Sequence, residues 1–279
     1  MTIRDDHALA ADLATEAGER LLRIRERMGF GDSAALRAEG DRASHVFLME
    51  SLGRLRPSDN ILSEEATREE RLDPRRLTAH RVWIVDPLDG TREFAERRAG
   101  PGSGSLRNQD GAEGSATIST AEGRSDWAVH VALWEGGRLA AGAVALPAQG
   151  RTLTTADPPK PPAFDGGRFR IAVSRTRPPE FVRKLAFLVG ADLVPIGSAG
   201  AKIAAVLTGE VEAYVHAGGQ YEWDSAAPVA VAQAAGVHAS RIDGSALTYN
   251  QADPSLPDIL VSLPELATSL LAGIRDLHR

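Results

Sequence analysis

The chain has 279 residues, of which 43% are hydrophobic and 25% charged, with a formal net charge of −6. This length fits one large domain or two closely packed lobes around a buried core. Because 38 acidic residues outnumber 32 basic ones, a general nucleic-acid binder is excluded, since that function needs clustered Lys and Arg.

Cysteine is absent from the sequence. This excludes disulfides, thiolate metal sites and a cysteine nucleophile. No apolar run approaches the ~18 residues that a membrane helix needs. The charged N-terminus also lacks the apolar segment of a signal peptide. We therefore expect a cytoplasmic protein without membrane contact.

The first half of the chain predicts two helices followed by strands. Apolar residues recur at spacings of three and four over 5–28 and 41–56, which is the period of an amphipathic helix. Residues 81–86 form a short β-branched run that indicates a buried strand. Two further strand-like runs, WAVHVALWE and RLAAGAVALP, are joined by two glycines at 136–137, which predicts a hairpin.

A segment of different composition separates these strands. Residues 97–125 are rich in Gly and Ser and nearly free of large apolar side chains, which favours a surface loop. Two interpretations stay open, a dispensable insertion and a lid over an active site.

In the second half, strands and helices alternate. The Pro- and Gly-rich segment 155–167 marks a boundary, so we expect an N-terminal lobe at 1–160 and a C-terminal lobe at 161–279. The alternation predicts a layered α/β fold in which helices sandwich the sheets. The expected elements are the strand RIAVS, a helix at 178–189, the strand LVPIG, a helix from near Ser198, the strand EAYVH, and helices at 225–235 and 263–275.

Three acidic motifs indicate the chemistry, namely SEE at 63–65, DPLDGT at 86–91 and WDSAA at 223–227. Clustered carboxylates resist burial unless cations compensate their charge. Two divalent cations would neutralise four carboxylates, and oxygen-only ligands favour Mg²⁺ or Mn²⁺ over zinc. The four carboxylates are those of Glu64, Asp86, Asp89 and Asp224.

The second motif places cation ligands beside anion donors. Asp86 and Asp89 end a strand, and Gly90 permits a tight turn. Such a turn can aim both carboxylates and the Leu88 carbonyl at one point, while the Gly90 and Thr91 N–H groups face an anion. This arrangement suits metal-assisted attack of water on a phosphate ester. The alternative, an Asp-rich surface turn, would not explain the other two motifs.

SEE, DPLDGT and WDSAA, in this order, resemble the signature of the lithium-sensitive, inositol monophosphatase-like phosphatase superfamily. The resemblance covers nearly the whole chain except 97–125. DPLDGTREF, AVSRTRPP, GSAGAK and QYEWDSAAP are most similar to the actinobacterial CysQ-type branch, which removes the 3′-phosphate of 3′-phosphoadenosine 5′-phosphate (PAP). The resemblance implies a five-layer αβαβα sandwich of the inositol monophosphatase and fructose-1,6-bisphosphatase type. It also implies two or three Mg²⁺ ions per site, with Mn²⁺ as a substitute, and inhibition by Li⁺.

The resemblance also implies roles for single residues. Thr91 would activate the attacking water together with Glu64, and Asp41 would hydrogen-bond Thr91. Water would attack directly, without a covalent phosphoenzyme. The implied metal ligands are Glu64, Asp86, the Leu88 carbonyl, Asp89 and Asp224.

Substrate contacts are expected around the same motif and at three other places. Arg175 suits a second phosphate, although an ordinary loop arginine remains the alternative. The Gly-rich turn at 197–202 suits a ribose or phosphate, or simply a helix cap. The expected substrate-binding residues are Asp89, Gly90, Thr91, Ser174, Arg175, Gly197, Ser198, Lys202, Glu222 and Asp224.

The expected reaction is hydrolysis of the 3′-phosphate of PAP, or of its 5′-phosphosulfate analogue PAPS, in sulfur assimilation. Inositol 1-phosphate, fructose 1,6-bisphosphate and the 2′-phosphate of NADP stay open as substrates, because the metal site contacts only the phosphate. Arg92-Glu93 departs from the Thr-Asn of inositol phosphatases, which weakens the inositol alternative. A metabolite-binding regulator with weak catalysis is the alternative from another class. Homodimers are common in the superfamily, and the sequence does not decide this point.

The seven histidines lack the spacing of metal ligands. His130, in a predicted strand, is therefore interpreted as structural.

Overall fold

Two long helices form the first layer of the fold. In the computed structural model, which describes residues 5–98 and 123–277, α1 spans Asp6–Met28 and α2 spans Ser33–Leu55. The α1 helix buries the apolar stripe that predicted it. The α2 helix begins eight residues before the predicted start, because the Asp32 side chain caps it by accepting the N–H groups of Ala34 and Ala35.

The first sheet lies against these helices and has the strand order β1-β2-β3-β4-β5. The strand β1 runs parallel to β2, and the other pairs are antiparallel. The predicted hairpin of β3 and β4 is confirmed. The strands are β1 (Asn60–Ser63), β2 (Arg81–Asp89), β3 (Ala128–Glu135), β4 (Arg138–Leu146) and β5 (Arg151–Thr154). Short helices in this half are α3 (Arg68–Arg71), α4 (Pro74–Thr78), α5 (Thr91–Phe94) and the 3₁₀ turn η1 (Pro147–Gln149).

The second sheet has the strand order β7-β6-β8-β10-β9. The strand β6 runs parallel to both of its neighbours, whereas β10 is antiparallel to β8 and β9. The strands are β6 (Arg170–Ser174), β7 (Asp192–Ile196), β8 (Ala213–Ala217), β9 (His238–Ser240) and β10 (Asp258–Ser262). The helices of this half are α6 (Glu180–Val189), α7 (Ala199–Leu207), α8 (Glu222–Ala234) and α9 (Pro264–Leu277).

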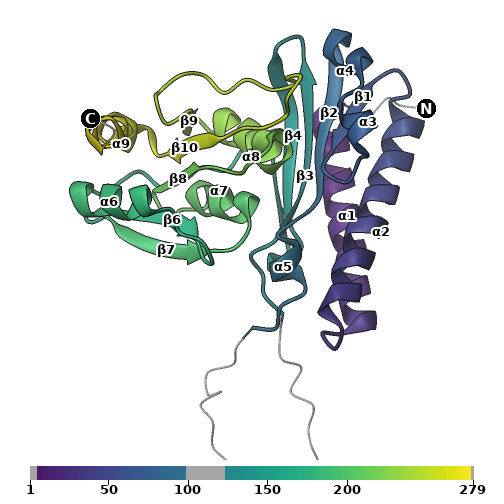
Figure 1. The fold of residues 1–279 in the computed structure, drawn as a ribbon, viewed down its shortest axis with the longest axis horizontal. Coiled ribbons are helices and arrows are strands. Elements are labelled where there is room, and N and C mark those ends of the chain that lie inside the picture. The colour runs from purple at the N-terminus through teal and green to yellow at the C-terminus, as the bar shows by residue number, and fades with distance from the viewer. Residues whose placement is uncertain (1–4, 99–122, 278–279) are drawn as a thin grey trace, which may run out of the picture.

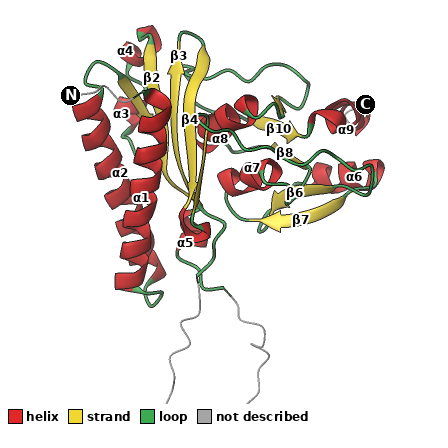
Figure 2. Cartoon of the chain, turned by 180° about the vertical axis from the view of Figure 1, so that it is seen from behind, coloured by secondary structure: helices red, strands yellow, loops and turns green. Residues whose placement is uncertain are grey.

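The elements stack in five layers, which confirms the predicted αβαβα sandwich (Figures 1 and 2). The α1 and α2 helices cover one face of the first sheet, and α7 and α8 lie between the two sheets. The α6 and α9 helices pack on the outer face of the second sheet. One apolar core joins both sheets through α7 and α8. The first sheet and α8 approach closely at Gly142 of β4, where an added Cβ would lie 2.7 Å from Ala230 Cβ.

Two predicted boundaries next to the acidic motifs were wrong. The β2 strand does not end before Pro87 but continues to Asp89. The helix predicted at 225–235 begins at Glu222, so Asp224 lies inside its first turn rather than before it. Both acidic motifs are therefore held by regular secondary structure.

The two sheets fall on either side of residue 160, since β5 ends at Thr154 and β6 begins at Arg170. The division into lobes at 1–160 and 161–279 stays a prediction. Residues 99–122, which make up most of the segment interpreted as an insertion or a lid, lie outside the described residues. Within 5–98 and 123–277, no helix combines the length and the apolar character needed to cross a bilayer.

Candidate metal centre

The end of β2 carries two buried carboxylates, Asp86 and Asp89, which are 1% and 6% exposed. In a regular strand, residues three apart point to opposite faces of the sheet. Here the pairing of β2 with β3 shifts register between Asp86 and Asp89. The irregularity lets both side chains reach the same point. The Leu88 N–H also donates to Asp86 Oδ1 over 3.0 Å, which fixes that carboxylate.

Gly90 turns the chain from β2 into α5. Its φ of +86° lies in the left-handed region that favours glycine. A Cβ at this position would lie 2.8 Å from Ser198 Cβ and 3.2 Å from Trp127 Cβ. Both the backbone conformation and the close approach therefore require glycine, and the turn places Thr91 at the start of α5.

Asp224 reaches the same point from α8. Its Oδ2 accepts the Tyr221 N–H over 2.6 Å, which anchors the carboxylate to its own helix start. Trp223 is buried and stacks on Tyr221 with ring centroids 4.7 Å apart. One carboxylate oxygen each from Asp86, Asp89 and Asp224 lie within 4.8 Å of one another. The second and third acidic motifs thus form one cluster.

Glu64, which follows β1, joins this cluster through a hydrogen bond with Asp86. Burial, together with the nearby Asp89 carboxylate, raises the pKa of Glu64 to about 7. Burial and the Glu64 and Asp89 charges raise the pKa of Asp86 well above its ordinary value. Burial and the Asp89 charge likewise raise the pKa of Asp224 to about 7. These carboxylates resist ionisation in one another's presence.

The donor set fits a divalent cation. The converging atoms are all carboxylate oxygens, which Mg²⁺ prefers as ligands. Burial and mutual repulsion raise the pKa of Glu64, Asp86 and Asp224, so their ionised forms need a compensating positive charge. A bound cation would supply the missing charge.

Thr91 and Asp41 lie together beside the cluster, as the sequence predicted. The Thr91 Oγ1 is 3.3 Å from Asp41 Oδ1 and 3.2 Å from the Leu88 carbonyl oxygen. One hydroxyl hydrogen serves only one of these acceptors at a time. Burial and the Glu65 charge raise the pKa of Asp41 to about 7. The hydroxyl is therefore held between two oxygen atoms and keeps lone pairs for another partner.

Asp89 connects the cluster to the second half of the fold. Its carboxylate accepts the N–H groups of Ala199 (3.2 Å) and Gly200 (2.5 Å) at the start of α7. Burial opposes its ionisation, but the contacts with His130, Gly200 and Lys202 hold its pKa below the ordinary value. The start of α7 therefore binds Asp89.

This geometry alters the interpretation of the Gly-rich turn at 197–202. The turn was expected to hold a ribose or phosphate, but its Ala199 and Gly200 N–H groups contact Asp89. Ser198 is the N-cap of α7 and accepts the Ala201 N–H. Lys202 is 4% exposed and donates to the Gly197 carbonyl. The described contacts of these residues are structural.

The substrate contact expected for Glu222 is also contradicted by its surroundings. Glu222 is 1% exposed, and its two carboxylate oxygens accept the N–H groups of Asn250 (2.6 Å) and Gln251 (2.7 Å). It fixes the 250–251 turn against α8 and does not join the cluster. Ser174 and Arg175 lie at the end of β6, where the Arg175 guanidinium pairs with Glu93 over 2.9 Å.

His130 is a site residue whose contact sequence reasoning missed. It is fully buried in β3, with Nε2 3.3 Å from Asp89 Oδ2 and Nδ1 3.0 Å from the Trp223 carbonyl oxygen. It therefore touches both β2 and α8, the two elements that carry the cluster. The available signal was its place in the predicted hairpin, because β3 pairs with β2 and sets His130 opposite Asp86.

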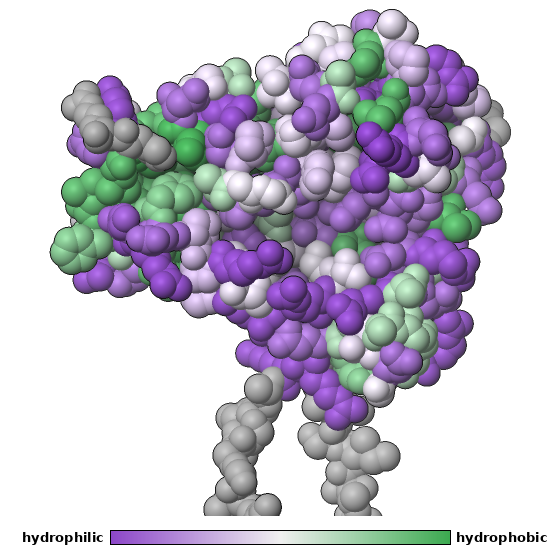
Figure 3. Space-filling view, viewed as in Figure 1, coloured by the Kyte–Doolittle hydropathy of each residue, from purple (hydrophilic) through white to green (hydrophobic). Residues whose placement is uncertain are grey.

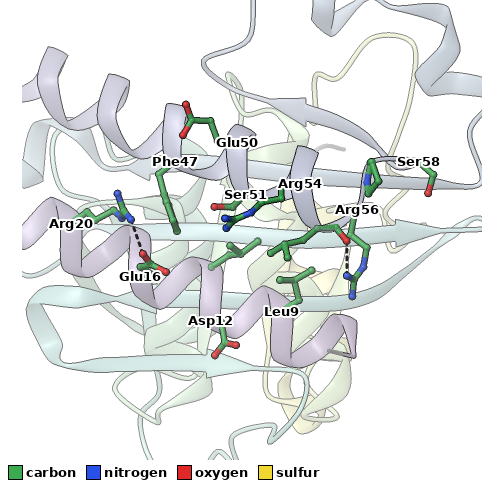
Figure 4. Close-up of a pocket in the computed structure, with 13 residues that line it drawn as sticks. Leu9, Asp12, Glu16, Arg20, Phe47, Glu50, Ser51, Arg54, Arg56 and Ser58 are labelled. Atoms are coloured by element: carbon green, nitrogen blue, oxygen red, sulfur yellow. Dashed lines mark hydrogen bonds and ion pairs between the residues drawn. The ribbon is translucent and has the colours of Figure 1, made fainter. Parts of the chain in front are cut away.

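A large cavity lies away from the carboxylate cluster. It measures about 1030 Å³ and lies between α1 and α2 (Figure 4). Apolar Leu9 and Phe47 share its lining with charged side chains such as Arg20 and Glu16, which pair with each other over 2.7 Å. No residue of the carboxylate cluster lines it. The chemistry of the donor set, rather than cavity size, therefore identifies the candidate site.

Comparisons with known proteins agree with this geometry. The family model described as "Inositol monophosphatase family" matches residues 6–278. A Mycobacterium leprae protein named 3′-phosphoadenosine 5′-phosphate phosphatase is 48% identical, over 97% of this chain and 94% of the relative. The Escherichia coli K12 protein named 3′(2′),5′-bisphosphate nucleotidase CysQ is 28% identical, over 90% and 97%. The solved structure of inositol monophosphatase II from Staphylococcus aureus is similar with a TM-score of 0.69, at 22% identity over 97% of this chain and 96% of that one. That last likeness concerns the fold alone.

Proposed function

Because the chain belongs to the inositol monophosphatase family, we propose that it is a phosphatase that hydrolyses the 3′-phosphate of PAP, giving AMP and phosphate. The observation that carries the chemistry is the convergence of Asp86, Asp89 and Asp224 beside the hydrogen-bonded pair of Thr91 and Asp41. The support for the adenosine substrate is the 48% identity to a relative named for this activity. PAPS, a role in sulfur assimilation, a cytoplasmic location and a homodimer are further parts of this proposal.

The carboxylates of the cluster would hold Mg²⁺, with Mn²⁺ as a substitute. Proposed ligands are one residue from the first motif, three from the second and one from the third. When bound, the cations supply Lewis-acid stabilisation of the charge on the phosphate and lower the pKa of water. The proposed ligands are Glu64, Asp86, the Leu88 carbonyl, Asp89 and Asp224.

The chain's own residues orient the reactants. The Thr91 hydroxyl, held by Asp41, accepts a hydrogen bond from the attacking water and aims its oxygen at phosphorus. Glu64, hydrogen-bonded to Asp86, accepts a proton from that water, in keeping with its raised pKa of about 7. The N–H groups of Gly90 and Thr91 hold the phosphoryl oxygens. A bond forms between the water oxygen and phosphorus, and the bond between phosphorus and the ribose 3′-oxygen breaks. The leaving oxygen takes a proton from solvent, and Glu64 releases its proton to solvent.

Phosphate release from a substrate panel tests the proposal. The panel contains PAP, PAPS, inositol 1-phosphate, fructose 1,6-bisphosphate and NADP, each with Mg²⁺ and with or without Li⁺. We expect the highest kcat/KM on PAP, inhibition by Li⁺ and complete loss of activity with EDTA. Equal rates on PAP and inositol 1-phosphate would contradict the substrate assignment, and activity that survives EDTA would contradict the metal requirement.

A further inference from the structure

A small pocket lined by three arginines begins one residue beyond Thr91, at Arg92 of α5. It measures about 260 Å³ and lies where the start of α2, the helix α5 and the loop after β6 meet. Pockets that enclose a whole small-molecule ligand measure roughly 300–1,000 Å³, so this one fits a single group of a larger ligand. Its lining residues are Ser33, Arg37, Arg92, Ala95, Glu96, Arg175 and Thr176.

The pocket is tied to the residues that orient the water. Arg92 directly follows Thr91 in α5. Arg37 precedes Asp41 by four residues in α2, so the two side chains are neighbours on one face of that helix. The Arg37 charge also favours ionisation of Asp41, as its effect on the pKa of that carboxyl shows. A ligand that spans both places would hold one group at the cluster and another at the arginines.

The three arginines of the pocket differ in the partners of their guanidinium groups. Arg175 pairs with both Glu93 and Glu96, so two carboxylates already neutralise its guanidinium. Arg37 donates through Nε to its own helix, to the Ser33 carbonyl. Within the described ranges, neither Arg37 nor Arg92 forms an ion pair with a carboxylate. Hydrophilic side chains (purple) also surround α5 on the face shown in Figure 3.

We propose that Arg37 and Arg92 bind the second phosphate of a bisphosphate substrate while the carboxylate cluster holds the phosphate that is cleaved. This inference rests on the proposed function and names the side chains that make the site selective for a bisphosphate. Guanidinium groups bind phosphate through two parallel N–H···O contacts. For PAP, the group in the pocket is the 5′-phosphate. Arg175, held by its two glutamates, forms the wall of the pocket.

The test compares two substrates that differ only in the second phosphate, PAP and adenosine 3′-monophosphate. Both are assayed with the wild type, Arg37→Gln, Arg92→Gln and the double variant. We expect kcat/KM for PAP to fall about 10- to 100-fold more than kcat/KM for the monophosphate, the size expected for a charged hydrogen bond. Arg183→Gln is the matched control, because Arg183 is exposed on α6 in the outermost layer. It should leave both values unchanged.

The outcomes separate the two proposals. If the variants lower both kcat/KM values equally, or neither, the second-phosphate pocket is wrong although the phosphatase proposal stands. If the wild type hydrolyses neither adenosine compound, the proposed function fails. Calorimetry then measures the affinity of the magnesium-loaded protein for the same two compounds. The proposed second-phosphate pocket requires PAP to bind more tightly than the monophosphate and Arg92→Gln to remove this difference. Any other result refutes the pocket.

Discussion

Thr91 shows how much a single side chain contributes at this site. Its hydroxyl lies between Asp41 and the Leu88 carbonyl, and its backbone begins α5. The hydroxyl of this side chain therefore has a defined position and defined partners, whereas its methyl group fills space. The two contributions can be separated by substitution.

We expect Thr91→Val to lower kcat by roughly 10²–10⁴-fold, because valine keeps the shape but cannot accept a hydrogen bond from the attacking water and orient it. Thr91→Ser keeps the hydroxyl and should stay within about tenfold of the wild type. Steady-state kinetics on PAP, with circular dichroism to check the fold, measures both. Equal activity of the valine and serine variants would contradict the role of the hydroxyl.

At the level of single residues, the sequence predicted the carboxylates better than their surroundings. Asp86, Asp89 and Asp224 were predictable because acidic motifs beside apolar sequence need a compensating positive charge when they are buried. The contact of His130 with Asp89 was not, since it depends on the pairing of β3 with β2. Glu222 and Lys202 are of residue types that often bind substrates. In the structure, however, Glu222 accepts the N–H of Asn250, 28 residues further along the chain, and Lys202 donates to the backbone carbonyl of Gly197.

Three elements, the end of β1, the end of β2 and the start of α8, bring the carboxylates together. Without a cation, Glu64 and Asp224 have pKa values near 7 in the folded protein, above their ordinary values of 4.5 and 3.8. Their protonated forms favour the folded state. The stability that they contribute is fully present below about pH 4 and is lost as the pH rises through about 7.

From this we expect Mg²⁺ to raise the melting temperature more at pH 8 than at pH 5.5. At pH 8 the cation binds ionised carboxylates and relieves their repulsion, whereas at pH 5.5 it must displace protons. Saturation at about 100 times Kd stabilises by about 2.7 kcal/mol, which corresponds to several degrees for a chain of this size. Differential scanning fluorimetry with KCl at matched ionic strength as the control measures the gain. An equal gain at both pH values would contradict the assignment.

The short helix α4 supports α8 from outside the cluster. Arg76 is 1% exposed and donates to the Asn250 side chain (2.6 Å) and to the carbonyl of Gln251 (3.0 Å). Glu222 of α8 holds the same turn from its other side. The turn is therefore fixed between α4 and the helix that carries Asp224.

Arg76→Ala should lower the free energy of unfolding by roughly 3 kcal/mol, because it leaves buried acceptors without a donor. Its neighbour Arg75 is the matched control, since Arg75 is exposed and pairs with Asp73 next to it on the surface. Arg75→Ala should leave stability nearly unchanged. Urea unfolding followed by tryptophan fluorescence compares the two, and similar midpoints for both variants would contradict the buried network.

Element types were more predictable than element boundaries. The apolar periodicity over 5–28 was sufficient to predict α1. The two glycines at 136–137 between two strand-like runs were sufficient to predict the β3–β4 hairpin. The start of α2 was placed too late because Gly40 and Asp41 interrupt the apolar pattern. Gly40 is needed there since a Cβ would lie 2.8 Å from Phe94 and 3.0 Å from Leu88. Such tertiary contacts override local propensity.

Across the whole molecule, the central layer of α7 and α8 joins the two sheets. At Gly142 of β4, an added Cβ would lie 2.7 Å from Ala230 and 3.2 Å from the Ala227 carbonyl oxygen. The layering itself was predictable from the alternation of strands and helices. The close spacing of β4 and α8 was not predictable, because it depends on two residues that lie 88 positions apart in the chain, Gly142 and Ala230.

We expect Gly142→Ala to destabilise the protein by roughly 1–3 kcal/mol, because the methyl group forces α8 away from β4. Gly53→Ala is the matched control, since a Cβ at Gly53 in α2 meets nothing within 4 Å. It should stabilise by roughly 0.5–1 kcal/mol through helix propensity. Chemical denaturation measures both. If Gly142→Ala proves as stable as Gly53→Ala, the close contact between β4 and α8 does not constrain the fold.

The contacts of Asp89 have a consequence for biosynthesis. Its hydrogen-bond partners in α7 lie 110 and 111 residues further along the chain, and Asp224 follows them. While the ribosome is still making the second half, the first sheet has emerged without the helices that cover its inner face. By the proposed function, neither cation binding nor turnover begins until α8, which carries Asp224, has left the exit tunnel. The newly made first half therefore exposes apolar surface for the time needed to translate the 80 residues from the end of β5 at Thr154 to the end of α8 at Ala234. Translation proceeds at about 5–20 residues per second, and we expect the first half to be a chaperone client in that interval.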